Sequence, residues 1–119
     1  MTTKPTARFR PFDVVSVPFP YADRAAEKRR PAVVVSAPDL EQDHGLLWLA
    51  MITSADNPSW SGDIVIPDLA PAGLPHPSVV RPAKLATLEA KRANRIGRLE
   101  PKTRAKVAEA IRSRIARID

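Results

Sequence analysis

Three consecutive cations, Lys28, Arg29 and Arg30, stand directly before Pro31 and a valine-rich run that ends at Val35. A residue that precedes proline is restricted to extended backbone, so we predict that Arg30 points in a fixed direction from the mouth of a strand. A guanidinium held in this way can bind a phosphate group through two parallel hydrogen bonds. Taken alone, a basic cluster before a strand is more often part of a solvated loop, and that alternative stays open.

Two adjacent hydroxyl side chains, those of Thr53 and Ser54, end the next apolar run along the chain. Either hydroxyl could donate a hydrogen bond to a phosphate oxygen, and either could instead close a strand-ending turn. Further along, Arg81 and Lys84 add positive charge to a segment that is predicted to be extended. The side chains that could do chemistry are thus cations and hydroxyls, which suit a phosphate-bearing ligand.

The charge balance of the whole chain favours the same kind of ligand. The 119 residues carry a formal net charge of +6, which favours a polyanionic partner, most simply a nucleic acid. There is no cysteine, and this excludes disulfides, thiolate zinc sites and cysteine nucleophiles. The two histidines, His44 and His76, lie in predicted loops without metal-ligand spacing, so we expect neither a metal nor another cofactor.

The elements that must position these side chains are mostly short strands. Residues 13–19 alternate with a period of two, which predicts a strand, and residues 32–35 have the β-branched composition of a buried central strand. Periodicity alone permits helix or strand for residues 46–52, but the short length and the preceding glycine favour a strand. Further strands are predicted at residues 63–66, 78–88 with a bend at Pro82, and 96–99, and irregular connections at residues 20–30, 38–45, 54–62 and 68–77.

The last segment changes to a helical period. Pro101 suits a first helical turn, with Glu100 as an acidic cap. One apolar stripe follows at spacings of four, four and three, formed by Val107, Ile111, Ile115 and Ile118. Five or six short, mostly antiparallel strands and a C-terminal helix predict an α+β fold, a small barrel-like domain.

The size of the chain predicts a single domain over residues 1–119, with residues 1–10 as a loose basic arm. These first ten residues lack the apolar segment of a secretory signal. The longest apolar run, residues 46–52, is too short to span a bilayer. We therefore expect a cytoplasmic protein with no membrane segment.

The order of the pieces along the chain resembles the MazF/PemK family of toxin endoribonucleases. The pieces are Asp13-Val14-Val15, Lys28-Arg29-Arg30-Pro31, Ile52-Thr53-Ser54, Gly62-Asp63-Ile64, Ala72-Gly73-Leu74, residues 78–84 and residues 96–99 before the final helix. The resemblance covers nearly the whole chain from about Phe12. Its most specific elements are the Arg-Pro-valine element and the Ser-Val-Val-Arg-Pro-Ala-Lys element.

This resemblance implies a small SH3-like β-barrel that works as a homodimer, and a toxin of a type II toxin–antitoxin module. It also implies an enzyme that cleaves single-stranded RNA, often mRNA, at short sequences without a metal. By position in the family motifs, Arg30 and Thr53 would be catalytic. The residues expected to bind the RNA backbone are Lys28, Arg29, Ser54, Arg81 and Lys84. The expected protein partner is a cognate acidic antitoxin, whose disordered tail would cover the basic groove.

The chain also departs from the family pattern at three positions. Phe12 stands where the family usually has glycine, and Ala86 where some members have arginine. Ala83 stands where some members place a carboxylate with an acid–base role, so the general acid and base are unassigned. Glu27 is a candidate base only because it is close to Arg30 in sequence.

Two alternatives to catalysis remain at this stage. The same barrel, without its acid–base carboxylate, could be a non-catalytic module that binds nucleic acid or a partner. A purely structural basic protein is the third possibility, and the concentrated Arg-Pro elements argue against it. Trp60, in the loop after Thr53, could stack on a base or simply anchor the loop to the barrel.

Overall fold

The computed structural model describes residues 6–19 and 28–117. Within these residues the strands are β1 (Asp13–Phe19), β2 (Lys28–Val34), β3 (Leu46–Ser54), β4 (Ile64–Val65), β5 (Ser78–Glu89) and β6 (Asn94–Arg98). The helices are α1 (Pro38–His44), α2 (Leu69–Ala72) and α3 (Pro101–Arg114), with a short 3-10 turn at Ala90–Arg92. None of the described helices is long and apolar enough to cross a membrane.

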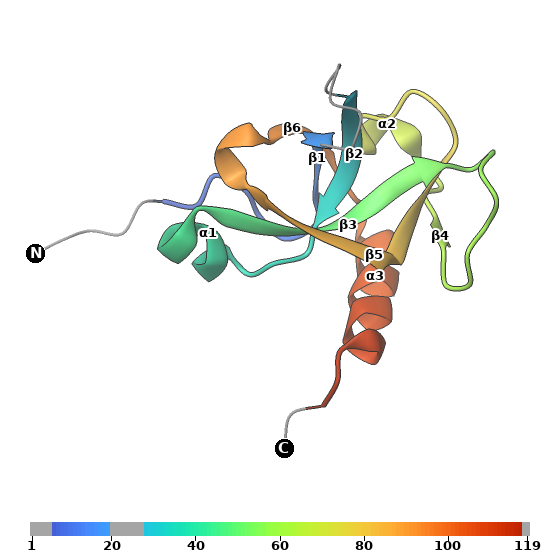
Figure 1. Cartoon of the computed structure of the whole chain (residues 1–119). Helices are drawn as coiled ribbons and strands as arrows, with labels where there is room; N and C mark the ends of the chain where they lie inside the picture. Colours follow the sequence, from blue (N-terminus) through green and yellow to red (C-terminus); the bar gives the residue numbers. More distant parts are fainter. Residues whose placement is uncertain (1–5, 20–27, 118–119) are drawn as a thin grey trace, which may run out of the picture.

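The strands form one antiparallel sheet in the order β4-β5-β3-β2-β1-β6. The sheet curls into a half barrel, in which the long strands β3 and β5 are neighbours and α3 packs beneath β5 (Figure 1). The predicted α+β fold of short antiparallel strands and a C-terminal helix is therefore confirmed.

The two faces of the sheet pack into two separate apolar cores. Because side chains alternate along a strand, β1 contributes Val15 and Val17 to one core and Val14 to the other. The first core is built mainly from strand residues, whereas the second is closed by Val107 of α3. Strands buried on both faces explain why residues 32–35 form a continuous apolar run rather than an alternating one.

A bulge interrupts the pairing of β5 with β3. Met51 pairs with Arg81, but the preceding Ala50 pairs with Leu85, so residues 82–84 have no partner in this ladder. Pro82 lacks an N–H group and suits such a position, which confirms the predicted bend. The bulge changes the direction of β5 directly after Arg81.

Two of the predicted irregular connections contain helices. Residues 38–44 form α1, which begins with Pro38 and ends at Gly45 in a left-handed conformation with φ of 68°. None of its residues is buried, so it lacks the apolar stripe by which a helix is recognised in a sequence. Residues 69–72 form α2, whose first turn is capped by the carboxylate of Asp68.

Other differences concern the ends of elements. Strand β2 begins at Lys28, inside the segment predicted as a charged loop. At Glu100 the backbone caps α3, but its side chain accepts no capping hydrogen bond. Ile115 follows the helix and is 57% exposed, so the apolar stripe packs only over its first part. Ile118 and Glu27 lie outside the described residues.

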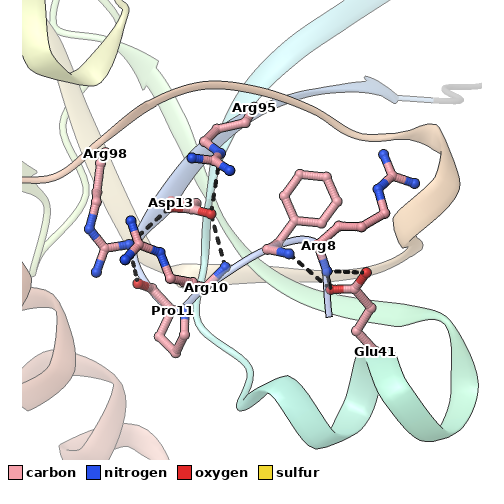
Figure 2. Close-up of polar contacts among 8 residues, drawn as sticks. Arg8, Arg10, Pro11, Asp13, Glu41, Arg95 and Arg98 are labelled. Atoms are coloured by element: carbon pink, nitrogen blue, oxygen red, sulfur yellow. Dashed lines mark hydrogen bonds and ion pairs between the residues drawn. The ribbon is translucent and has the colours of Figure 1, made fainter. Parts of the chain in front are cut away.

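The start of β1 is fixed by a network of polar contacts. Asp13 is fully buried, accepts hydrogen bonds from Arg98 Nη1 and the backbone N–H of Arg10, both at 2.9 Å, and lies 3.6 Å from Arg95 Nε (Figure 2). The carboxylate of Glu41 on α1 accepts from the backbone N–H groups of residues 8 and 9. Within the predicted basic arm, residues 8–10 are thus bound to the domain.

Phe12 has a positive φ of 73°, the only such value among the described non-glycine residues. This left-handed conformation is one that glycine adopts without penalty, which is a physical reason for a glycine at this position in the resembling family. In this chain the conformation is held by two backbone hydrogen bonds, from Phe12 N to Val34 O and from Leu99 N to Phe12 O. The phenyl ring packs against the second core.

Candidate active site

Arg30 lies in β2 on the same side of the sheet as Ala32 and Val34, at the end of an apolar row that belongs to the first core. It is opposite Val17 of β1. The side chain is half-buried, and its Nε atom is buried completely. The predicted extended backbone of Arg30 is confirmed, but the strand already begins at Lys28, so Arg30 lies within β2 and not at its mouth.

Arg30 lines a small pocket of about 50 Å³ together with Thr53, Arg81 and Lys84. The remaining lining residues are Phe19, Met51 and Ile52. Four of the predicted site residues, which come from three different strands, therefore converge on one concavity. Cations and a hydroxyl beside apolar side chains are suited to a phosphate group, because electrostatic attraction is stronger in a partly buried position than in open water.

The hydroxyl of Thr53 is oriented by a neighbouring side chain. Its Oγ1 accepts a hydrogen bond of 2.6 Å from Asn57 Nδ2. A threonine hydroxyl has one donor and two acceptor positions, so this contact uses an acceptor position and leaves the O–H group to donate. Thr53 can thus give a hydrogen bond to an anion in the pocket.

Arg81 is only 8% exposed, and part of its guanidinium is already bonded within the protein. Its Nε and Nη2 donate to the two carboxylate oxygens of Asp63 at 3.0 and 2.9 Å, and Nη2 also donates to the carbonyl of Pro58. The hydrogen bonds from Arg81 hold the pKa of Asp63 below its usual value. The same pair raises the pKa of Arg81. The Nη1 group of Arg81 remains available to a ligand in the pocket.

The indole of Trp60 covers one face of this guanidinium. The distance from Arg81 Cζ to the centroid of the Trp60 ring is 4.2 Å, a cation–π contact. A longer contact of the same kind, 5.7 Å, joins Lys84 Nζ to the ring of Phe19, and both of these residues line the pocket.

The structure places two of the predicted RNA-binding residues away from the pocket. The guanidinium of Arg29 donates to the hydroxyl and carbonyl of Ser16 and to the carbonyl of Arg92. The hydroxyl of Ser54 accepts from Asp56 N, as in a turn. Lys28 is exposed at the start of β2, opposite Phe19 of the pocket lining. For Lys28, Arg29 and Ser54, RNA binding stays a prediction.

Asp63 and Asn57 were not predicted as site residues, although Asp63 belongs to the Gly62-Asp63-Ile64 piece that resembles the family. The contact between Asp63 and Arg81 depends on the pairing of β4 with β5, in which Ile64 is opposite Val80. In the sequence, Asp63 stands out only as the polar first residue of the strand predicted over residues 63–66 and as part of that family piece. Within residues 6–19 and 28–117, no group of three or more histidine, aspartate or glutamate side chains is arranged to hold a metal ion.

Residues 10–115 match the family model described as PemK-like, MazF-like toxin of type II toxin-antitoxin system. No curated protein sequence matches the chain.

Several solved structures have a similar fold. MazF from Deinococcus radiodurans (crystal form I) superposes with a TM-score of 0.70 at 22% identity, covering 94% of this chain and 96% of that one. MazE-MazF from the same organism (form II) has a TM-score of 0.67 at 20% identity, with 94% and 95% covered. The toxin MazF-mt6 of Mycobacterium tuberculosis has a TM-score of 0.64 at 23% identity, with 87% and 94% covered. At these identities the likeness shows a shared fold.

Proposed function

Because the chain belongs to the PemK-like, MazF-like toxins of type II toxin–antitoxin systems, we propose that it is a metal-independent endoribonuclease that cuts single-stranded RNA at short sequences. The observation that carries this proposal is the convergence of Arg30, Thr53 and Arg81 on one pocket. The substrate is a polyanion, in keeping with the net charge of +6.

Cleavage of RNA without a metal requires three events. The 2′-hydroxyl loses its proton and its oxygen bonds to phosphorus, the resulting phosphorane is stabilised, and the 5′-oxygen takes a proton as its bond to phosphorus breaks. In this site Arg30 donates hydrogen bonds to the phosphorane oxygens, where negative charge increases. The O–H of Thr53 and Nη1 of Arg81 supply further donors. Donors fixed before the reaction stabilise this charge without reorganisation.

The residues that move the protons are not assigned by this geometry. Ala83 provides no carboxylate, and Glu27 lies outside the described residues, so its role as a base stays a prediction. Asp63 is a poor candidate, because a base works best when its pKa is near the working pH and the pKa of Asp63 is lowered by Arg81.

We extend the proposal to the partners of the chain. An acidic antitoxin would cover the pocket with a disordered segment and neutralise its cations, and the toxin would act as a homodimer in the cytoplasm, where mRNA is found. Relatives described as MazE-MazF, and an endoribonuclease in complex with its cognate antitoxin from a mycobacterial species, support an antitoxin partner.

The test is incubation of the protein with single-stranded RNA in the presence of a chelator. We expect discrete fragments, and we expect Arg30→Ala to lower the cleavage rate by about 10²–10³-fold, the usual loss when one fixed donor to a developing anion is removed. Arg112→Ala is the matched control, since this arginine is 71% exposed on α3 and pairs with Glu109. Cleavage by Arg30→Ala at the wild-type rate would show that the site is wrong.

A non-catalytic binding module is the second candidate function. It is favoured by Ala83 at the family's carboxylate position and by the bonds that occupy most of the Arg81 guanidinium. RNA binding without any fragments, even at high protein concentration, would establish this alternative.

A further inference from the structure

We propose that the exposed face of the Trp60 indole is a stacking site for one nucleobase of the RNA, held beside the pocket by Arg81 and Asp63. The inference rests on the proposed function, because it takes single-stranded RNA as the ligand. It adds a base-binding position to a pocket that otherwise offers only phosphate contacts.

Trp60 belongs to neither apolar core. It lies in the loop between β3 and β4, is 46% exposed, and is flanked by exposed residues from Ala55 to Gly62. A tryptophan that only anchored the loop would bury its ring against the barrel. Here the contact recorded for the ring is with the guanidinium of Arg81 on one face. The large exposed fraction leaves aromatic surface for a second planar group.

Trp60 is fixed by two hydrogen bonds of its backbone and by one contact of its ring. The Asp63 carboxylate accepts from the backbone N–H of Trp60 at 2.9 Å, and the N–H of Asp63 donates to the carbonyl of Trp60 at 3.1 Å. The same carboxylate binds Arg81, whose guanidinium lies against the indole. A side chain ordered before binding loses less conformational freedom when the ligand arrives, which favours affinity.

The chemistry of the cluster favours a base over a phosphate. The charge of Arg81 is balanced by Asp63, and both side chains are about nine-tenths buried. An indole presents a π-face, and every nucleobase has a π-face that stacks on aromatic rings regardless of sequence. Because Arg81 also lines the pocket with Arg30, a base on Trp60 would belong to a nucleotide close to the bound phosphate.

In this arrangement Arg81 and Asp63 are positioning residues for Trp60. The Asp63 carboxylate turns Nε and Nη2 of Arg81 toward β4, so that the flat face of the guanidinium supports the ring. Loss of the carboxylate would leave the indole in the loop but without a fixed orientation.

The experiment uses the fluorescence of Trp60 itself. The chain has two tryptophans, so Trp48→Phe leaves Trp60 as the single emitter. The probe is a mixed-sequence 2′-O-methyl RNA, which cannot be cut because its 2′-oxygens are blocked, and its binding is followed separately by the anisotropy of an end label. We expect RNA to quench Trp60. We expect Trp60→Leu to weaken binding by roughly tenfold or more, and Trp60→Phe by less.

A double-mutant cycle tests the positioning role. Asp63→Asn should weaken binding when Trp60 is present and have little further effect in the Trp60→Leu background. Equal effects of Asp63→Asn in both backgrounds would overturn the positioning role. Far-UV circular dichroism and thermal melting identify any variant that fails to fold, and the Trp60→Leu and Trp60→Phe pair then decides the stacking role.

The outcomes separate this inference from the proposed function. If the parent cuts natural RNA while bound RNA leaves Trp60 emission unchanged, the stacking site is wrong and the nuclease stands. If the 2′-O-methyl RNA quenches the emission of Trp60 but natural RNA gives no fragments, the stacking site stands and the proposed nuclease activity is wrong. Quenching by an acidic peptide but not by RNA would overturn the inference and identify a protein partner for this ring.

Discussion

Asp13 is a single residue that joins three parts of the chain. Its buried carboxylate bonds to Arg98 and Arg95 of β6 and to the backbone at Arg10 (Figure 2). We expect Asp13→Ala to lower the free energy of unfolding by about 2 kcal/mol, because charged hydrogen bonds are lost in a buried position while the arginines can partly regain water.

Urea denaturation measures the effect of Asp13→Ala. Asp56→Asn is the control, since Asp56 is an exposed loop aspartate whose recorded contact is made by its backbone N–H. A loss for Asp13→Ala no larger than that of the control would contradict the stabilising role of this network.

Asp63 makes stability depend on pH in a defined direction. Its pKa in the folded state is lowered from 3.8, chiefly by the hydrogen bonds from Arg81. A carboxyl with a lowered folded-state pKa stabilises the protein fully above its unfolded-state pKa, and that contribution is lost as the pH falls through the folded-state pKa. We therefore expect the Arg81–Asp63 pair to stabilise the protein at neutral pH and to lose this contribution in acid.

The measurement compares the thermal midpoints of wild type and Asp63→Asn between neutral pH and about pH 2. The difference between the two proteins should be largest at neutral pH and should shrink in acid. A difference in thermal midpoint that stays constant over this pH range would show that the charge of the Asp63 carboxylate does not contribute to stability.

At the scale of elements, two glycines that end helices provide a matched comparison. Gly45 after α1 and Gly73 after α2 both have left-handed backbones, with φ of 68° and 71°. A Cβ on Gly45 meets open space, whereas a Cβ on Gly73 would clash with the carbonyl of Ile96 in β6. The close approach of α2 to β6 thus requires the missing side chain.

We expect Gly45→Ala to lower the free energy of unfolding by about 1 kcal/mol, because of backbone strain alone. Gly73→Ala should cost at least about 2 kcal/mol more, because a backbone carbonyl cannot rotate away as a side chain can. Thermal unfolding of both variants checks the difference. Equal losses of stability in the two variants would mean that α2 and β6 move apart easily to make room for the added Cβ.

The strands were predictable from sequence because their burial leaves a pattern. Alternation located β1 to the residue, and the buried run after Pro31 located the inner part of β2. Helix α1 was not predictable, since none of its residues is buried and its sequence carries no apolar stripe. The bulge at residues 82–84 was visible only as a proline, because register depends on the partner strand.

The candidate site was predictable only in part. Arg30 lies in β2 and Thr53 near the end of β3, two strands that could be predicted from the sequence, so their convergence followed once the sheet was formed. The bond between Arg81 and Asp63 joins residues 18 positions apart and needs the register of β4, a strand of two residues. No local pattern contains that information.

At the scale of the whole molecule, none of the residues that line the candidate pocket comes from α3. The pocket is lined by Met51 of the first core and Ile52 of the second, and α3 contributes Val107 to the second core. Substitutions on the outer side of α3 should therefore leave the pocket unchanged, which is why Arg112 serves as the control for Arg30.

The formal charge of +6 overstates the number of cations that a ligand can reach. Several arginines bond to protein carbonyls or carboxylates, among them Arg29, Arg81, Arg98 and Arg104. Since the salt dependence of RNA binding reflects the phosphates that are contacted, it should follow the cations around the pocket rather than the net charge.

The loop between β3 and β4 holds several parts of the proposed machinery at once. It carries Asn57, which orients the hydroxyl of Thr53, and it carries Trp60 and the carbonyl of Pro58 that bind Arg81. A mutation that reshapes this loop to favour another base would also disturb the donor that acts on the phosphate. Under the proposed function, this one loop therefore determines both the preferred RNA sequence and the rate of cleavage. A change of target sequence in evolution would require compensating substitutions within the same nine residues, 55–63.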